Sequence, residues 1–161
     1  MTKIIYKIRT RLKDFDYRGY YRYFLTLCTS HKTPILGDAS IVEWLTNVLV
    51  DKSKHHGFKI WAYCFMPDHL HLLIEGTTAN SDMRRFISDY KQLTGFSLKK
   101  KIGQSLWQMN YVDNVLRKEE DTLNVTRYIL NNPVRRGLVD DYDDYKDYKH
   151  LGSFEVDVKE L

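Results

Sequence analysis

The sequence predicts a single α+β domain, with an antiparallel β-sheet and helices packed on one face of it. Three observations predict this class. Short aromatic and β-branched runs typical of strands alternate with longer runs at helical spacing, in the order strand, helix, hairpin, helix, strand, helix. No repeat, low-complexity segment or linker divides the 161 residues, a length typical of one domain. The composition, 43% hydrophobic and 14% aromatic, is sufficient for a core.

The first half of the chain predicts three strands and one helix. Apolar residues at helical spacing follow Asp38 and Ser40, which are candidate N-caps, and Gly57 ends this helix. The two later strands form a hairpin whose turn contains Pro67, because proline cannot donate a hydrogen bond within a ladder. The predicted strands are residues 20–28, 58–65 and 69–75.

The second half begins with an amphipathic helix within residues 80–101. Asn80 or Ser81 is the expected cap, and Gly95 either ends the helix or weakens it. One side of this helix is apolar and the other is basic.

Two further elements complete the prediction. Residues 106–116 form a short strand or an extended loop. Residues 121–131 form the last helix, and Pro133 is expected to end it because the residue before a proline disfavours the helical conformation.

Charge is distributed unevenly along the chain. The net charge is +4, but residues 140–161 carry 3 basic and 8 acidic side chains, so the rest of the chain is strongly basic. A basic body favours a polyanionic partner such as nucleic acid. The acidic end is expected either to be solvated or to fold over the basic surface.

The sequence also predicts the cellular compartment of the protein. No apolar run approaches the ~20 residues needed to cross a bilayer, and the first residues lack the pattern of a signal peptide. Cys28 and Cys64 have no CxxC partner and are interpreted as reduced core residues. We therefore expect a cytoplasmic protein with no membrane partner.

Two histidines stand one residue apart in an otherwise apolar run. Because side chains alternate along a strand, His69 and His71 share one face, while Leu70 and Leu72 point to the other and can pack against helices. Two neutral imidazoles on one face suit a divalent ion that also takes oxygen ligands. Histidines that only hydrogen-bond to the backbone show the same spacing, so the pair alone leaves both roles open.

Tyr128 and Asn132 share one face of the last predicted helix, because they are four residues apart. Near two imidazoles, a phenol and a carboxamide would supply a nucleophile and a third metal ligand. The alternative is a tyrosine that packs its ring and an asparagine that caps the helix before Pro133.

Three motifs together resemble those of the REP-associated tyrosine transposases, members of the HUH (His-hydrophobic-His) class of single-strand transposases. The resemblance implies one domain over residues 1–161, with a core at about 20–139 and an acidic C-terminal extension at 140–161. It also implies a ferredoxin-like antiparallel sheet with the histidines on a central strand. The motifs, in the family's order, are PDHLHLLIEG (67–76), WQMNYVDNVLR (107–117) and YILNNPVRRGLV (128–139).

The resemblance implies a metal-dependent enzyme that cleaves and rejoins single-stranded DNA next to hairpins. Tyr128 would attack a backbone phosphate and leave a 5′-phosphotyrosine and a free 3′-hydroxyl. His69, His71 and Asn132 would hold Mg²⁺ or Mn²⁺ at that phosphate.

One departure from the family concerns the second motif. Relatives usually carry an acidic residue followed by histidine there, whereas here Asp113 is followed by Asn114. If that histidine assists catalysis or orders DNA, this chain is expected to be slower or altered in specificity.

The expected partner is single-stranded or hairpin DNA, whose phosphates basic side chains would hold. A homodimer is one arrangement that the resemblance allows, because in some relatives the tyrosine of one chain serves the histidines of the other. The candidate DNA-binding residues are Arg84, Arg85, Lys91, Arg135 and Arg136.

Other functions stay open on the sequence. A ferredoxin-like nucleic-acid-binding module could keep this fold without chemistry, and HUH replication initiators or relaxase-type nickases share the two histidines. The NPV segment after Tyr128 favours the transposase branch. Histidine-triad hydrolases need a third alternating histidine, where Leu73 stands.

Overall fold

The computed structural model describes residues 14–117, 119–141, 144–145 and 149–151. Its main elements are β1 (Arg22–Cys28), α1 (Ala39–His55), β2 (Phe58–Met66), β3 (His69–Gly76), α2 (Met83–Ile102), β4 (Val112–Leu116), α3 (Glu119–Arg135) and β5 (Lys149–Leu151). Every strand pair is antiparallel, and the strand order is β4-β1-β3-β2-β5. The run from β1 to β4 is the β-α-β-β-α-β order of ferredoxin-like folds, so the predicted fold class is confirmed.

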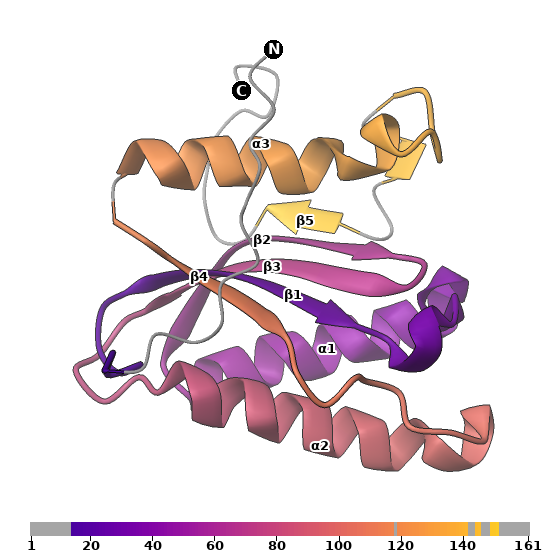
Figure 1. Cartoon of the computed structure of the whole chain (residues 1–161), viewed down its shortest axis with the longest axis horizontal. Helices are drawn as coiled ribbons and strands as arrows, with labels where there is room; N and C mark the ends of the chain where they lie inside the picture. The colour runs from indigo at the N-terminus through magenta and orange to yellow at the C-terminus, as the bar shows by residue number, and fades with distance from the viewer. Residues whose placement is uncertain (1–13, 118, 142–143, 146–148, 152–161) are drawn as a thin grey trace.

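Helices cover both faces of the sheet (Figure 1). α1 and α2 lie side by side on one face, as the sequence predicts, whereas α3 lies on the opposite face. The physical reason is that β2 is buried along almost its whole length, so both of its faces need a cover. α3 provides the second cover with an apolar stripe that packs on Phe24 and Leu73. This stripe consists of Val125, Ile129 and Leu130.

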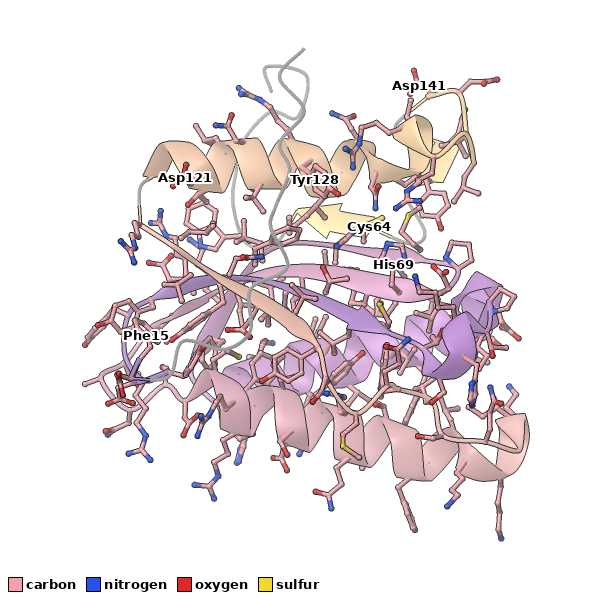
Figure 2. The ribbon with its side chains drawn as sticks, in the orientation of Figure 1. Phe15, Cys64, His69, Asp121, Tyr128 and Asp141 are labelled. Carbon is pink, nitrogen blue, oxygen red and sulfur yellow. The ribbon has the colours of Figure 1, made fainter. Side chains whose placement is uncertain are left out.

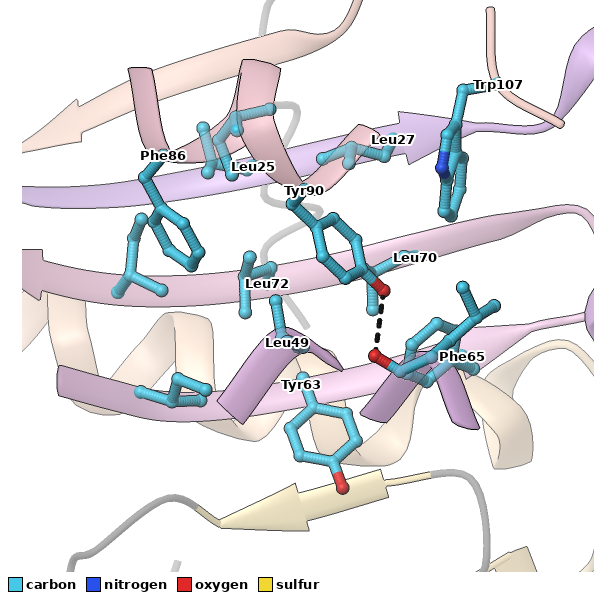
Figure 3. Close-up of a cluster of buried hydrophobic side chains, with 14 of the residues drawn as sticks. Leu25, Leu27, Leu49, Tyr63, Phe65, Leu70, Leu72, Phe86, Tyr90 and Trp107 are labelled. Carbon is cyan, nitrogen blue, oxygen red and sulfur yellow. Dashed lines mark hydrogen bonds between the residues drawn. The ribbon is translucent and has the colours of Figure 1, made fainter. Parts of the chain in front are cut away.

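β3 lies in the centre of the sheet, and its side chains alternate as predicted. Leu70 and Leu72 point into the apolar cluster beneath α1 and α2 (Figure 3). His69 and His71 therefore point to the face that α3 covers. The strand that forms the core on one side thus presents both imidazoles on the other.

Several buried polar groups within the α1–α2 layer are paired, whereas the buried Tyr23 hydroxyl has no hydrogen-bond partner among the described residues. The Tyr90 hydroxyl donates to the Leu45 carbonyl at 3.1 Å, the bond drawn in Figure 3. The Trp107 indole donates to Thr94 Oγ1 at 2.9 Å, and its side chain is only 5% exposed. Trp107 is therefore part of the core.

Helix caps agree with the sequence at one helix and differ at the other. Asp38 caps α1 by accepting from two backbone amides of its first turn. The cap of α2 is Asp82, rather than Asn80 or Ser81, because its carboxylate accepts from the third amide of the helix. Gly95 lies inside α2 and does not end it.

α3 continues through Pro133 to Arg135, which corrects the prediction of a helix ending at residue 131. Pro133 lies in the last turn, so it removes only one backbone hydrogen bond of the helix. Residues beyond it continue the ladder, since the Arg136 amide donates to the Asn132 carbonyl at 3.0 Å. The turn that follows α3 contains Gly137 in the left-handed region, with φ of 72°. Residues 128–135 consequently lie on one continuous helix.

Part of the acidic extension joins the sheet. Tyr145 is 9% exposed and donates its hydroxyl to the Phe65 carbonyl at 2.8 Å, and β5 pairs with the edge of β2. The remaining residues of the extension, 142–143, 146–148 and 152–161, lie outside the described residues, and so does the predicted contact with the basic surface. No helix within the described part of the chain has the length and apolar character to span a membrane.

Candidate active site

His69 and His71 form a close pair on the α3 face of β3. Their Nε2 atoms are 3.2 Å apart and their ring centroids 4.6 Å apart. On β2, Met66 and Cys64 stand directly opposite the two histidines and share their face. Figure 2 shows Cys64 and His69 between the sheet and α3. The two imidazoles thus neighbour the sulfur-containing, largely apolar side chains of Met66 and Cys64.

The outer nitrogen of each imidazole is held by a neighbouring side chain. His69 Nδ1 lies 2.6 Å from a carboxylate oxygen of Asp68, and His71 Nδ1 lies 3.0 Å from the hydroxyl of Thr26. A carboxylate or hydroxyl at one ring nitrogen favours the tautomer that leaves the other nitrogen available as a ligand. Both Nε2 atoms are in this way directed at one point.

Burial keeps both imidazoles neutral. Burial, the largest effect, together with the neighbouring His69, Arg135 and Arg136, lowers the pKa of His71 to about 3. Burial also lowers the pKa of His69, although Asp68 opposes this effect. Neutral imidazoles are the form that binds metal ions.

Tyr128 reaches the histidine pair from α3. Its ring centroid lies 5.7 Å from that of His71, in an edge-to-face arrangement, and 5.9 Å from that of Phe24. Phe24 itself lies 5.5 Å from His71. Tyr128 is half-buried, and Figure 2 shows it on α3 above the sheet. One phenol from α3 and two imidazoles from β3 therefore come together, although β3 ends at Gly76 and α3 begins only at Glu119.

Asn132 follows one helical turn after Tyr128 and is 1% exposed. Its Oδ1 accepts a hydrogen bond of 2.9 Å from Arg135, while its Nδ2 is buried without a hydrogen-bond partner. The Arg135 guanidinium also lies 3.9 Å from the centroid of the Tyr128 ring. A series of direct contacts thus connects the histidine pair to Tyr128, Arg135 and Asn132.

Within the described residues, no group of three or more His, Cys, Asp or Glu side chains is arranged to bind a metal ion. Among the described residues, a third protein ligand beside the two imidazoles would be of another kind. The Asn132 carboxamide oxygen, one turn from Tyr128, is a candidate of the right chemistry.

Compared with known protein families, residues 18–132 match the family described as "Transposase IS200 like". The chain belongs to this family. The match includes the histidine pair, Tyr128 and Asn132, the residues that the sequence motifs singled out.

Two relatives of this family member come from Haemophilus influenzae. One is an uncharacterised protein, 27% identical over 77% of this chain and 86% of its own length. The other bears the provisional name of a REP-associated tyrosine transposase and is 26% identical over 80% of this chain and 77% of its own length.

Two solved structures share the fold. A REP-associated tyrosine transposase bound to a REP hairpin superimposes with a TM-score of 0.71 at 18% identity, over 88% of this chain and 82% of that one. A protein from Deinococcus radiodurans described as a transposase gives a TM-score of 0.52 at 21% identity, over 76% of this chain and 97% of that one.

The predicted DNA-binding residues fall into two separate groups. Arg135 and Arg136 lie at the end of α3, beside the candidate site, whereas Arg84, Arg85 and Lys91 lie on α2, across the sheet. The Lys91 ammonium donates to the backbone carbonyls of residues 108 and 109, at 2.7 and 2.8 Å. Lys91 therefore has a structural contact besides any role with DNA.

Two surface hollows also lie along α2 rather than at the His69–His71 pair. One, of about 760 Å³, is lined by Arg85 among others, and one of about 540 Å³ by Arg84 and Lys91. Neither hollow is lined by the histidine pair, Tyr128 or Asn132.

Sequence reasoning missed the side chains that hold the imidazoles. Asp68 directly precedes His69, and a carboxylate beside a candidate metal-binding histidine is a usual supporting partner. Thr26 is found only once the β1–β3 register is known, which places it opposite His71. The contacts of Arg135 could be predicted only with the knowledge that α3 continues past Pro133.

Proposed function

We propose that this protein is an HUH tyrosine transposase that cleaves and rejoins single-stranded DNA next to hairpins through a 5′-phosphotyrosine. The observation that carries the proposal is the placement of the Tyr128 ring against His71, in a chain that belongs to the IS200-like transposase family. The related fold solved with a REP hairpin supports hairpin DNA as the substrate. Because the substrate would be DNA, we place its action in the cytoplasm.

The residues of the site fit a divalent ion, Mg²⁺ or Mn²⁺, held by His69, His71 and Asn132. The two imidazole Nε2 atoms lie 3.2 Å apart, and the buried Asn132 carboxamide lies one helical turn from the nucleophile. The carboxamide oxygen has two lone pairs, so it can accept from Arg135 and still act as a ligand. When bound, such an ion supplies charge stabilisation at the scissile phosphate.

The chain's own groups would carry out the bond changes. The Tyr128 oxygen attacks phosphorus, so that a tyrosine–phosphate bond forms as the bond from phosphorus to the 3′-oxygen breaks. The phenolic proton leaves to water, and the departing 3′-oxygen takes a proton to become a hydroxyl. Arg135 and Arg136 would neutralise neighbouring phosphates. Rejoining is the reverse attack by a 3′-hydroxyl on the phosphotyrosine, which needs no nucleotide cofactor because the bond is conserved.

We further propose that cleavage occurs in cis, within one protomer. The support is that Tyr128 reaches His71 of its own chain, so a homodimer is not needed to assemble the site. Mixing the Tyr128→Phe and His71→Ala proteins tests this. In cis, the mixture forms no covalent adduct, whereas a tyrosine acting in trans would restore one.

The central test is covalent capture of DNA. Protein is incubated with a single-stranded oligonucleotide carrying a hairpin and with Mg²⁺ or Mn²⁺, and adducts are separated on a denaturing gel. We expect an adduct that is lost in Tyr128→Phe and with EDTA, and kept in Tyr20→Phe, a control tyrosine that is 66% exposed.

Two other outcomes would contradict the proposal in different ways. Hairpin binding without an adduct under either metal would favour a nucleic-acid-binding module. An adduct that never transfers its strand to a second 3′-end would favour a nickase over a transposase.

A further inference from the structure

Arg135, the last residue of α3, contacts both α3 side chains that the proposed reaction uses. Its guanidinium carbon lies 3.9 Å from the centroid of the Tyr128 ring. Its Nη2 donates to Asn132 Oδ1 at 2.9 Å. A guanidinium is planar, so it can stack its face on a ring while it donates from its edge, which an ammonium group cannot do.

The helical course of α3 explains why these three residues meet. Positions 128, 132 and 135 are separated by four and three residues, so they form one stripe. The stripe exists only because α3 continues through Pro133. Arg136 lies about 100° further round the helix axis, which follows from 3.6 residues per turn, and it acts electrostatically on the histidines.

Phe24, His71 and Arg135 all contact the half-buried Tyr128 ring. Phe24 and His71 meet it in edge-to-face geometry from the sheet, and Arg135 covers it within its own helix. Without Arg135 the ring would keep these two sheet contacts and lose the stacking contact from its own helix. An attacking oxygen has to be held near its line of attack, since a misplacement of ~1 Å costs about 10²-fold in rate.

The contact with Asn132 has a separate consequence. Arg135 has donors and no acceptor, so its hydrogen bond requires the oxygen of the carboxamide on its side. The amide plane of this nearly inaccessible side chain is thereby fixed.

We propose that Arg135 is a positioning residue that holds the Tyr128 ring and the Asn132 carboxamide in a single mutual orientation. This inference rests on the proposed function, and it goes beyond the phosphate contact expected of a basic residue at this place. It assigns Arg135 an effect on the rate of the covalent step, separate from any effect on DNA affinity.

The test separates rate from affinity. Adduct formation is measured in a single turnover at saturating hairpin DNA, and the DNA dissociation constant is measured by fluorescence anisotropy. Arg135→Lys and Arg135→Gln are expected to slow adduct formation at saturation at least about tenfold. Arg136→Lys is expected to change the DNA dissociation constant rather than the rate of adduct formation at saturation. Arg18→Lys is the matched control, because Arg18 is exposed and, within the described residues, forms its ion pair with Asp82 at the far end of the sheet.

A second readout does not depend on activity. In protein labelled with 3-fluorotyrosine, the ¹⁹F signal of Tyr128 is identified by its absence in Tyr128→Phe. We expect this signal to shift in Arg135→Gln and to stay unchanged in Arg18→Lys, with equal melting temperatures as a control for folding.

The outcomes distinguish the two proposals. An unchanged Tyr128 signal together with an unchanged rate at saturation in Arg135→Gln overturns the positioning role. A shifted signal in a protein that forms no adduct with any hairpin supports the positioning contact and contradicts the proposed function.

Discussion

The two faces of the sheet differ in how their buried polar groups are used. On the α1–α2 face, buried polar groups such as Tyr90 and Thr94 pair with groups of the same layer and strengthen the packing. On the α3 face, the buried His71 imidazole and the half-buried His69 imidazole turn their Nε2 atoms toward each other, and the buried Asn132 carboxamide has an amide nitrogen without a hydrogen-bond partner in the described part of the chain. Both faces are built from the same strands.

This difference indicates that the α1–α2 face mainly stabilises the fold, whereas the α3 face carries the candidate site. A buried polar group without a partner costs stability. The Asn132 amide nitrogen carries this cost on the α3 face one helical turn from Tyr128, and the Tyr23 hydroxyl carries it on the α1–α2 face. The α1–α2 face carries the larger apolar cluster. Substitutions on the two faces should therefore separate loss of folding from loss of function.

The largest loss of stability is expected from Leu72→Ala. Leu72 is fully buried between the sheet and α1 and α2, and such truncations cost about 2–5 kcal/mol in the free energy of unfolding. Urea unfolding followed by circular dichroism measures it. A cost below about 1 kcal/mol would mean that this face is not the main source of stability.

Thr94→Val should cost less. It keeps the shape of the side chain but leaves the buried Trp107 N–H without its acceptor, a loss of about 1–3 kcal/mol. The same unfolding experiment applies, and the binding of Mn²⁺ should be unchanged because Thr94 lies on the other side of the sheet.

Thr26→Val is the matched substitution on the α3 face. Thr26 holds His71 Nδ1 from a half-buried position, so we expect a stability loss under ~1 kcal/mol. Removing such a supporting hydrogen bond usually lowers metal affinity about 10–100-fold. Titration with Mn²⁺ followed by electron paramagnetic resonance measures this affinity. If Thr26→Val matched Thr94→Val in stability and left Mn²⁺ binding intact, the contrast between the faces would fail.

The smallest effect on stability is expected from Asn114→His, within about 0.5 kcal/mol. Asn114 is half-buried on β4 directly opposite Phe24, so it shares the face of the histidines. The resemblance implies a histidine at this position in relatives, and we expect the substitution to raise the rate of adduct formation. An unchanged or lower rate would show that this chain does not depend on that position.

Much of the fold was predictable because it depends on local patterns. The alternation of His69, Leu70, His71 and Leu72 correctly separated the two faces of β3. Of the two predicted caps of α1, Asp38 and Ser40, the structure selects Asp38. The cap of α2 was misplaced because Asn80, Ser81 and Asp82 are all good capping residues. In the folded chain Ser81 is fully buried, and Asp82 caps α2. This choice depends on packing and not on the local sequence.

The site was predictable as a set of residues but not as an arrangement. Motif order identified His69, His71, Tyr128 and Asn132, whose roles stay predictions. The helix prediction stopped before Pro133, since propensity rules weigh the lost hydrogen bond and not the packing of α3 on the sheet. Because the predicted helix did not reach Arg135, the contact of Arg135 with Tyr128 was not predicted.

The sequence by itself determined which side chains each strand and helix presents together, because periods of 2.0 and 3.6 residues are local properties of the backbone. It thereby determined that the imidazoles share a face and that Tyr128 and Asn132 share another. The tertiary structure alone decided that these two faces meet, with α3 across the sheet from α1 and α2. The physical reason is that the second apolar face of the sheet had to be covered, and covering it with α3 brings the phenol to the histidines.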